Sequence, residues 1–108
     1  MYKLVFFVPD SHVEEVKEAI FATGAGKIGN YSHCSWQTLG QGQFKPLQGS
    51  NPFSGIQGNL SRCEEWRVEL VLEKSLAKAA ITALKKAHPY ETPAFDLIEL
   101  IDPFKDLG

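Results

Sequence analysis

Four segments of the chain have the apolar pattern of β-strands. Tyr2–Val8 is apolar at both odd and even positions, which indicates a strand covered on two faces. Glu65–Glu73 alternates cleanly between apolar and polar residues. Asn30–Leu39 carries aromatic and β-branched residues, and Ala94–Ile101 is again apolar on both sides. We therefore expect four strands.

Two further segments repeat their apolar residues at helical spacing. The first, Val13–Thr23, follows Ser11, which together with Glu14 inside the segment has the form of a capping box. The second begins at Ser75, a predicted N-cap, and ends near His88, because a proline follows. We expect one helix after the first strand and one before the last.

Residues Gly40–Leu60 break both periodicities, since seven of these twenty-one residues are Gly or Pro. We predict an extended loop or a hairpin extension over 40–60, with a short strand around Gln43–Pro46. The order of elements predicts an α+β ferredoxin-like βαββαβ two-layer sandwich, a single domain over residues 1–108. Both helices would cover one face of the sheet. The apolar residues on the other face of the first and last strands predict a homo-oligomer.

Composition narrows the class of partner. Eleven Lys and Arg against thirteen Asp and Glu give a net charge of −2, which offers no basic surface for nucleic acid. The longest apolar run, Leu4–Pro9, is too short to span a membrane, and no signal peptide pattern is present. We expect a cytoplasmic protein that binds neither nucleic acid nor membrane. The two cysteines, Cys34 and Cys63, are expected to be free thiols.

Several side chains could bind a divalent metal, but their spacing matches no zinc signature. They are His12, His33, Cys34, Cys63 and His88, with Glu91 as an oxygen donor. His33 and Cys34 would point to opposite faces of a strand, so a buried thiol and a hydrogen-bonding imidazole are the alternatives. Glu64 and Glu65 are expected to be solvated charges. No spacing supports a nucleophile with a base, so we name no catalytic residue.

The stretch His88–Pro93 is the densest polar and rigid part of the chain. Pro89 and Pro93 restrict the backbone around Tyr90 and Glu91. Such a stretch can preorganise a binding site, or it can be a structured connection from helix to strand whose polar groups satisfy the backbone. Both interpretations stay open at this stage.

Three segments, Gly24–Ser35, Phe44–Phe53 and His88–Asp96, together resemble the accessory domain of the NIF family (YqfO-like). The motif residues are Gly26, Gly29, Tyr31, Pro89, Tyr90 and Pro93. In that family the domain is inserted in a larger body that holds two metal ions, and it is similar to the trimeric CutA and PII proteins. The resemblance implies a ferredoxin-like fold and a trimer. It transfers no metal ligand, because those ligands belong to the larger body.

These observations lead us to expect a non-enzymatic, oligomeric binding or regulatory module, a stand-alone version of the accessory domain. Its small-molecule or protein partner would be held by the loop 40–60 and by the motifs around His33 and His88. The alternative is a divalent-metal protein of the CutA type, with His33, Cys34, His88 and Glu91 as candidate ligands. The sequence leaves the cofactor open, with a divalent metal as the candidate.

Overall fold

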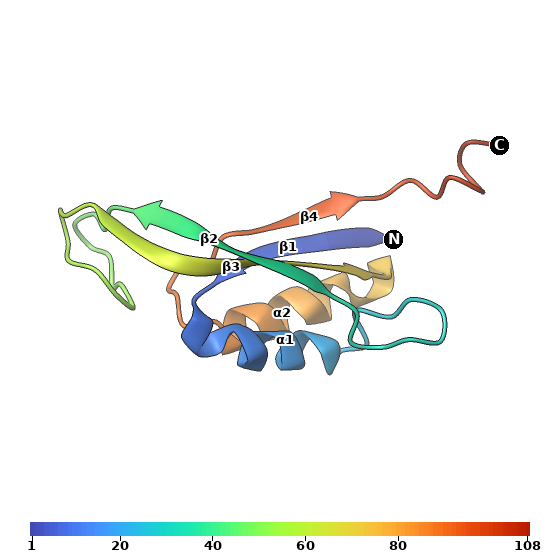
Figure 1. Cartoon of the computed structure of the whole chain (residues 1–108), viewed down its shortest axis with the longest axis horizontal. Helices are drawn as coiled ribbons and strands as arrows, with labels where there is room; N and C mark the ends of the chain where they lie inside the picture. The colour runs from blue at the N-terminus through green and yellow to red at the C-terminus, as the bar shows by residue number, and fades with distance from the viewer.

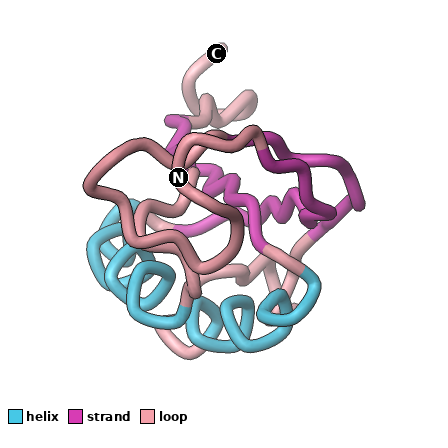
Figure 2. Tube along the Cα trace, turned by 90° about the vertical axis from the view of Figure 1, so that its left-hand side faces the viewer, coloured by secondary structure: helices cyan, strands magenta, loops and turns pink.

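The computed structural model describes all residues from Met1 to Gly108. One antiparallel sheet lies over a layer of two helices (Figures 1 and 2). Its strand order, β2-β3-β1-β4, is that of a ferredoxin-like sandwich and confirms the predicted fold class. In chain order the elements are β1 (Tyr2–Val8), α1 (Val13–Phe21), β2 (Trp36–Phe44), β3 (Ser61–Leu72), α2 (Ala77–Ala87) and β4 (Phe95–Glu99).

The core lies between the sheet and the helices. β1 contributes Leu4, Phe6 and Val8, all fully buried, and their partners on β3 are apolar as well. The β3 residues that share this face are Trp66, Val68, Leu70 and Leu72, as the alternation in the sequence predicts. α1 and α2 close the layer with Val16, Ile20, Ala80 and Leu84. The helices therefore cover one face only.

The two predicted helix N-caps are wrong. A short 3-10 turn, Asp10–His12, precedes α1, and the Ser11 hydroxyl lies 2.8 Å from Nδ1 of His12 instead of capping the helix. Helix α1 also ends two residues before the predicted Thr23. There the chain turns through Gly24, whose φ of +97° belongs to the left-handed region that glycine adopts readily.

Helix α2 has the same kind of entry. Ser75 lies within the 3-10 turn Lys74–Leu76 and caps nothing through its side chain, so α2 begins at Ala77. The predicted end holds, because the helix stops at Ala87 and the amide of His88 donates to the carbonyl of Leu84. Both helices thus begin from 3-10 turns in which i to i+3 bonds satisfy the backbone.

The second strand is displaced from its prediction. β2 runs from Trp36 to Phe44. Over its whole length it pairs with the first part of β3, from Trp36 opposite Glu69 to Phe44 opposite Ser61. Residues 30–35 form a turn instead of a strand, with an isolated bridge between Ile28 and Tyr31. Pairing with β3 decides this boundary, since Gly40 and Gly42 are accepted in a strand whose backbone has a partner.

The predicted loop 40–60 is therefore a hairpin extension. β2 and β3 reach beyond the body of the sheet as a twisted arm, and the loop proper is 45–60 (Figure 1). The strand expected at Gln43–Pro46 is the end of β2. The last strand is shorter than expected, and β4 leads into an exposed C-terminal segment.

The sheet face that no helix covers is mixed rather than uniformly apolar. Val5 is only 2% exposed at its centre, but Lys3 and Arg67 flank it and both approach Glu69, at 3.8 and 3.7 Å. Larger apolar side chains are exposed toward the two edges of the sheet, among them Trp36 at 61% and Ile98 at 45%. An oligomer stays a prediction that these edges support.

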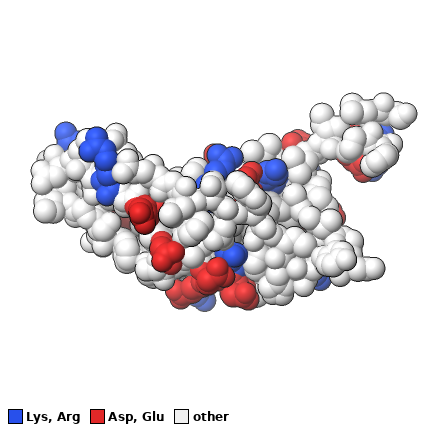
Figure 3. Space-filling model, in the orientation of Figure 1, with Lys and Arg blue, Asp and Glu red and all other residues white.

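Charge is distributed unevenly over the surface. In Figure 3 carboxylates gather over the first helix, where Glu14, Glu15 and Glu18 are exposed, and basic residues lie at the tip of the hairpin. Neither helix has the length and apolar character needed to cross a lipid bilayer.

Candidate functional site

A pocket of about 610 Å³ lies where the hairpin arm meets the sheet face that no helix covers. Its walls come from β1, both strands of the arm, the loop 45–60 and the segment before β4. Side chains that matter for its chemistry are Phe7, Phe44, Phe53, Glu65, Arg67, Tyr90 and Glu91. A pocket of this volume is in the range that encloses small organic ligands.

A hydrogen bond across the pocket joins two distant parts of the chain. The hydroxyl of Tyr90 donates to Oε2 of Glu65 at 2.8 Å, and Sγ of Cys63 lies 3.9 Å from the same hydroxyl. Gly42, opposite on β2, leaves room for this arrangement, because a methyl group there would overlap the Glu65 carboxylate. The absence of a side chain at residue 42 therefore lets Glu65 reach Tyr90.

Tyr90 stays protonated in this setting. Burial raises the pKa of its phenol far above the usual value of 10, and the hydrogen bond to Glu65 and the negative charge of that carboxylate raise it further. The protonated phenol is therefore a hydrogen-bond donor to Glu65.

We predict that Tyr90→Phe lowers the free energy of unfolding by roughly 1.5 kcal/mol, because it removes the donor to a half-buried carboxylate. Urea denaturation measures the change. Tyr31→Phe is the matched control, since Tyr31 is 76% exposed and its loss of a hydroxyl should cost less than about 0.5 kcal/mol. Equal losses in the two variants would contradict the structural role given to Tyr90.

His88 fixes the start of the segment that carries Tyr90. Its Nε2 lies 2.7 Å from the carbonyl of Phe7 and donates to it, and its Nδ1 accepts the amide of Tyr90 at 3.1 Å. These two bonds require the neutral imidazole. The side chain is buried, and this burial lowers its pKa, although the bond to Phe7 and the charge of Glu65 oppose the change.

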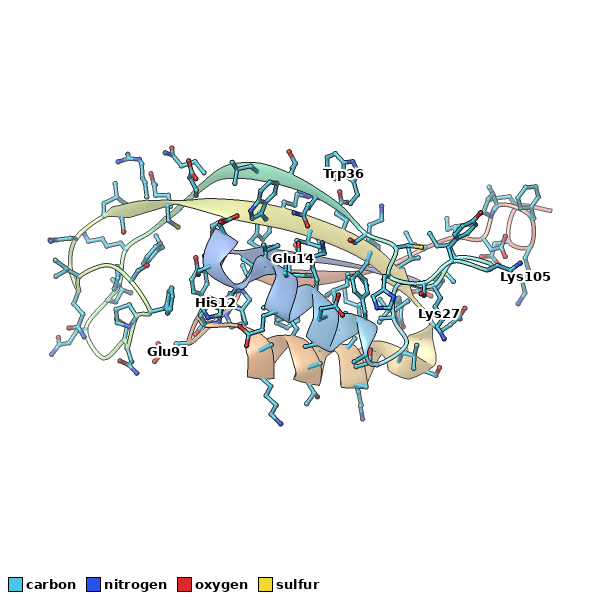
Figure 4. The ribbon with its side chains drawn as sticks, turned by 60° about the horizontal axis from the view of Figure 1, so that its bottom comes forward. His12, Glu14, Lys27, Trp36, Glu91 and Lys105 are labelled. Atoms are coloured by element: carbon cyan, nitrogen blue, oxygen red, sulfur yellow. The ribbon has the colours of Figure 1, made fainter.

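Glu91 ties the folded-back loop to the same site. Both its carboxylate oxygens accept the amide of Asn51, at 3.3 and 3.2 Å. Phe53 from the loop packs near Tyr90, with ring centroids 6.1 Å apart, and edge-on against His12 at 5.5 Å. Figure 4 places Glu91 and His12 together at the hairpin end of the molecule. The stretch His88–Pro93 is thus both a structured connection and a wall of the pocket.

His33 and Cys34 lie elsewhere. His33, at a φ of +58°, contacts the last turn of α1, with its ring 4.9 Å from that of Phe21 and Nε2 3.8 Å from a Glu18 oxygen. Cys34 approaches the carbonyl of Ser32 at 3.7 Å. This is the far end of α1 from His12, about 12 Å along the helix. His33 and Cys34 therefore do not meet His88 and Glu91 within one chain.

No group of three or more His, Cys, Asp or Glu side chains in the chain is arranged to hold a metal ion. Among the motif residues of this end, Gly26 and Gly29 have positive φ, at +83° and +56°, and shape the turn between α1 and β2. Tyr31 extends into solvent. The Gly24–Ser35 motif therefore has a structural role in the single chain.

The sequence did not point to Glu65 as a site residue. It was expected to be a solvated charge beside Glu64, yet it is half-buried and bonded to Tyr90, twenty-five positions away. The only sequence signal available was its position on the same strand face as Arg67, opposite the core residues. Phe7 of β1 pairs with Arg67 in the sheet and shares that face.

No protein-family model matches the chain. It is 45% identical over 108 residues to a protein of Halalkalibacterium halodurans named GTP cyclohydrolase 1 type 2 homolog, covering 100% of this chain and 29% of the relative. A Bacillus subtilis protein of the same name is also 45% identical, with 98% and 29% covered. The chain therefore spans less than a third of the length of these relatives.

Solved structures of similar proteins agree with the sequence comparison. A Bacillus cereus protein related to NIF3 superposes with a TM-score of 0.81 at 44% identity, over 94% of this chain and 26% of its own. CutA1 from Pyrococcus horikoshii superposes with a TM-score of 0.70 at 17% identity, over 99% and 90% of the two chains. At that identity CutA1 shows the fold alone. Over nearly its whole length, the chain is therefore similar to one CutA-like domain within NIF3-related (YqfO-like) proteins.

Proposed function

We propose that this domain is a non-enzymatic binding or regulatory module that holds a small ligand in the pocket beside the hairpin. The observation that carries the proposal is the pocket itself, about 610 Å³ in volume and walled by segments that are far apart in the sequence. Its walls are held by Tyr90, His88 and Glu91, so the shape is preorganised for a ligand.

We also propose that the domain works as a homo-oligomer, with a trimer favoured by its resemblance to CutA and PII proteins. Exposed apolar side chains at both sheet edges support this, since Trp36 and Leu39 of β2 and Leu97 and Ile98 of β4 are more than a third exposed. Such side chains gain stability when a second copy covers them.

Light scattering at low micromolar concentration tests the assembly. We expect a mass near three times the 12.0 kDa of one chain. Trp36→Lys places a charge on an exposed apolar edge and is expected to shift the population toward the monomer. A monomeric mass for the unaltered chain would contradict the oligomer.

A thermal-shift screen against nucleotides, including GTP, and small metabolites tests the ligand. Any compound present at 100 times its dissociation constant should stabilise the folded state by about 2.7 kcal/mol, which raises the melting temperature by several degrees. GTP belongs in the screen because the relatives' name refers to GTP cyclohydrolase. If no compound of any charge raises the melting temperature, the pocket is not a small-ligand site, and a protein partner becomes the only partner to test.

The CutA-type metal alternative would need ligands from more than one copy. His33 and Cys34 lie at one end of α1, and His88 donates and accepts within its own chain. In the neutral ring Nε2 carries the proton and Nδ1 accepts the Tyr90 amide, so neither nitrogen of His88 has a free lone pair for a metal. The pocket is therefore the better supported site.

A further inference from the structure

The pocket combines aromatic rings with carboxylates. Phe7, Phe44, Phe53 and Tyr90 line it, and the rings of Phe53 and Tyr90 have centroids 6.1 Å apart. The face of an aromatic ring attracts a positive charge, and the attraction grows when the charge is removed from water. Glu65 and Glu91 add two negative charges to the same walls.

Neither carboxylate has a positive partner. No Lys, Arg or His nitrogen lies within 4.0 Å of Glu65 or Glu91, and their hydrogen-bond donors are the Tyr90 hydroxyl and the Asn51 amide. Glu65 is half-buried, with one oxygen bound to Tyr90 and the other over Gly42. A half-buried carboxylate without a counter-charge favours a cation nearby.

The one basic residue of the lining already has partners. The guanidinium of Arg67 lies 6.0 Å from the centroid of the Phe7 ring and 3.7 Å from a carboxylate oxygen of Glu69. This pair reduces the repulsion that Arg67 would exert on a positive ligand. It also shows that this sheet face accommodates a guanidinium over an aromatic ring.

We infer that the pocket binds an organic cation, an ammonium or guanidinium group carried on an apolar stem. The inference rests on the proposed function of the pocket as a ligand site and names the class of ligand. The stem would lie along the phenylalanine rings and the charge would face Glu65. A polyanion would meet two carboxylates and a single paired arginine, so the same walls disfavour it.

Three probes of similar shape separate charge from shape. We would titrate the isotopically labelled chain with butylguanidinium, with the neutral butylurea and with the anionic pentanoate, following amide shifts at Gly42 and Tyr90 by NMR. We expect butylguanidinium to bind at least ten times more tightly than butylurea, and pentanoate not to bind. Added salt should weaken the cation selectively.

Matched variants test whether Glu65 is the carboxylate that binds the cation. Glu65→Gln keeps an oxygen that can accept from Tyr90 and should weaken butylguanidinium at least tenfold without changing butylurea. Glu64→Gln is the control, since Glu64 precedes it on the strand, is exposed and does not line the pocket. Urea denaturation of both variants confirms that they fold. N-acetylarginine methylamide, compared with butylguanidinium, distinguishes a basic side chain of a partner from a free small cation.

The outcomes separate this inference from the proposed function. Preference for butylurea or pentanoate, or an equal loss in the Glu64 and Glu65 variants, would overturn the cation and leave the pocket a ligand site. Failure of all three probes to bind at millimolar concentration would also overturn the proposal of a cationic ligand. The metabolite screen would then decide whether the pocket binds a small ligand at all. Selective binding that depends on Glu65 would support both.

Discussion

Replacing Gly26 with alanine is expected to lower the free energy of unfolding by roughly 3 kcal/mol. The residue is buried at a φ of +83°, a region that costs an L-residue about 1 to 2 kcal/mol. The new methyl group would also lie 2.7 Å from a carbon of the buried Phe21 ring and 3.2 Å from the carbonyl oxygen of Cys34. Overpacking of this kind adds about 1 to 3 kcal/mol, so the two effects act together.

Gly29→Ala is the matched control for this change. Gly29 belongs to the same motif and also has a positive φ, +56°, but nothing lies within 4 Å of an added methyl group. The decrease in the free energy of unfolding of Gly29→Ala should therefore come only from the backbone, about 1 kcal/mol. Urea denaturation of the three proteins measures both values. If the two variants lose equal stability, the contact between residue 26 and Phe21 does not explain the need for glycine.

Replacing His88 with alanine is expected to cost roughly 2 to 4 kcal/mol. The side chain is 6% exposed, and its removal leaves the carbonyl of Phe7 and the amide of Tyr90 without their partners. An unsatisfied buried polar group costs about 1 to 3 kcal/mol, and the cavity adds to it. Because Tyr90 follows two residues later, we also expect the pocket wall to loosen.

His88 further predicts how stability depends on pH. Burial lowers its folded-state pKa from 6.5, so the unfolded chain binds more protons than the folded chain once the pH falls toward 6.5. Stability is therefore full above about pH 7.5 and declines as the pH decreases, with a slope of at most about 1.4 kcal/mol per pH unit from this group. Unfolding measured at pH 7.5, 6.5 and 5.5 should reveal the decline.

His88→Gln tests the assignment, because an amide can still donate to Phe7 but does not titrate. We expect this variant to be less stable at pH 7.5 and to lose most of the decline between pH 7.5 and 5.5. His33→Gln, at an exposed histidine, should keep it. An unchanged decline in the His88 variant would assign the pH dependence to another group.

The periodicity of the sequence determined the order of strands and helices and the core face of β3. Trp66, Val68, Leu70 and Leu72 alternate with polar residues, and such alternation reports burial directly because successive side chains of a strand point to opposite faces. The helical stripes were equally informative. The type of each element and its buried face depend on residues that are close together in the sequence. A pattern of a few residues is therefore enough to predict them.

The tertiary structure alone decided where β2 lies and which residues meet in the pocket. A strand with two glycines has little intrinsic preference, and only its hydrogen bonds with β3 place it at Trp36–Phe44. Glu65 meets Tyr90, and Glu91 meets Asn51, across long stretches of chain. Local patterns carry no record of such pairs, because they depend on how the arm, the loop and the sheet pack together. The pocket is therefore a product of the fold, built from residues whose chemistry the sequence displays without showing that they converge.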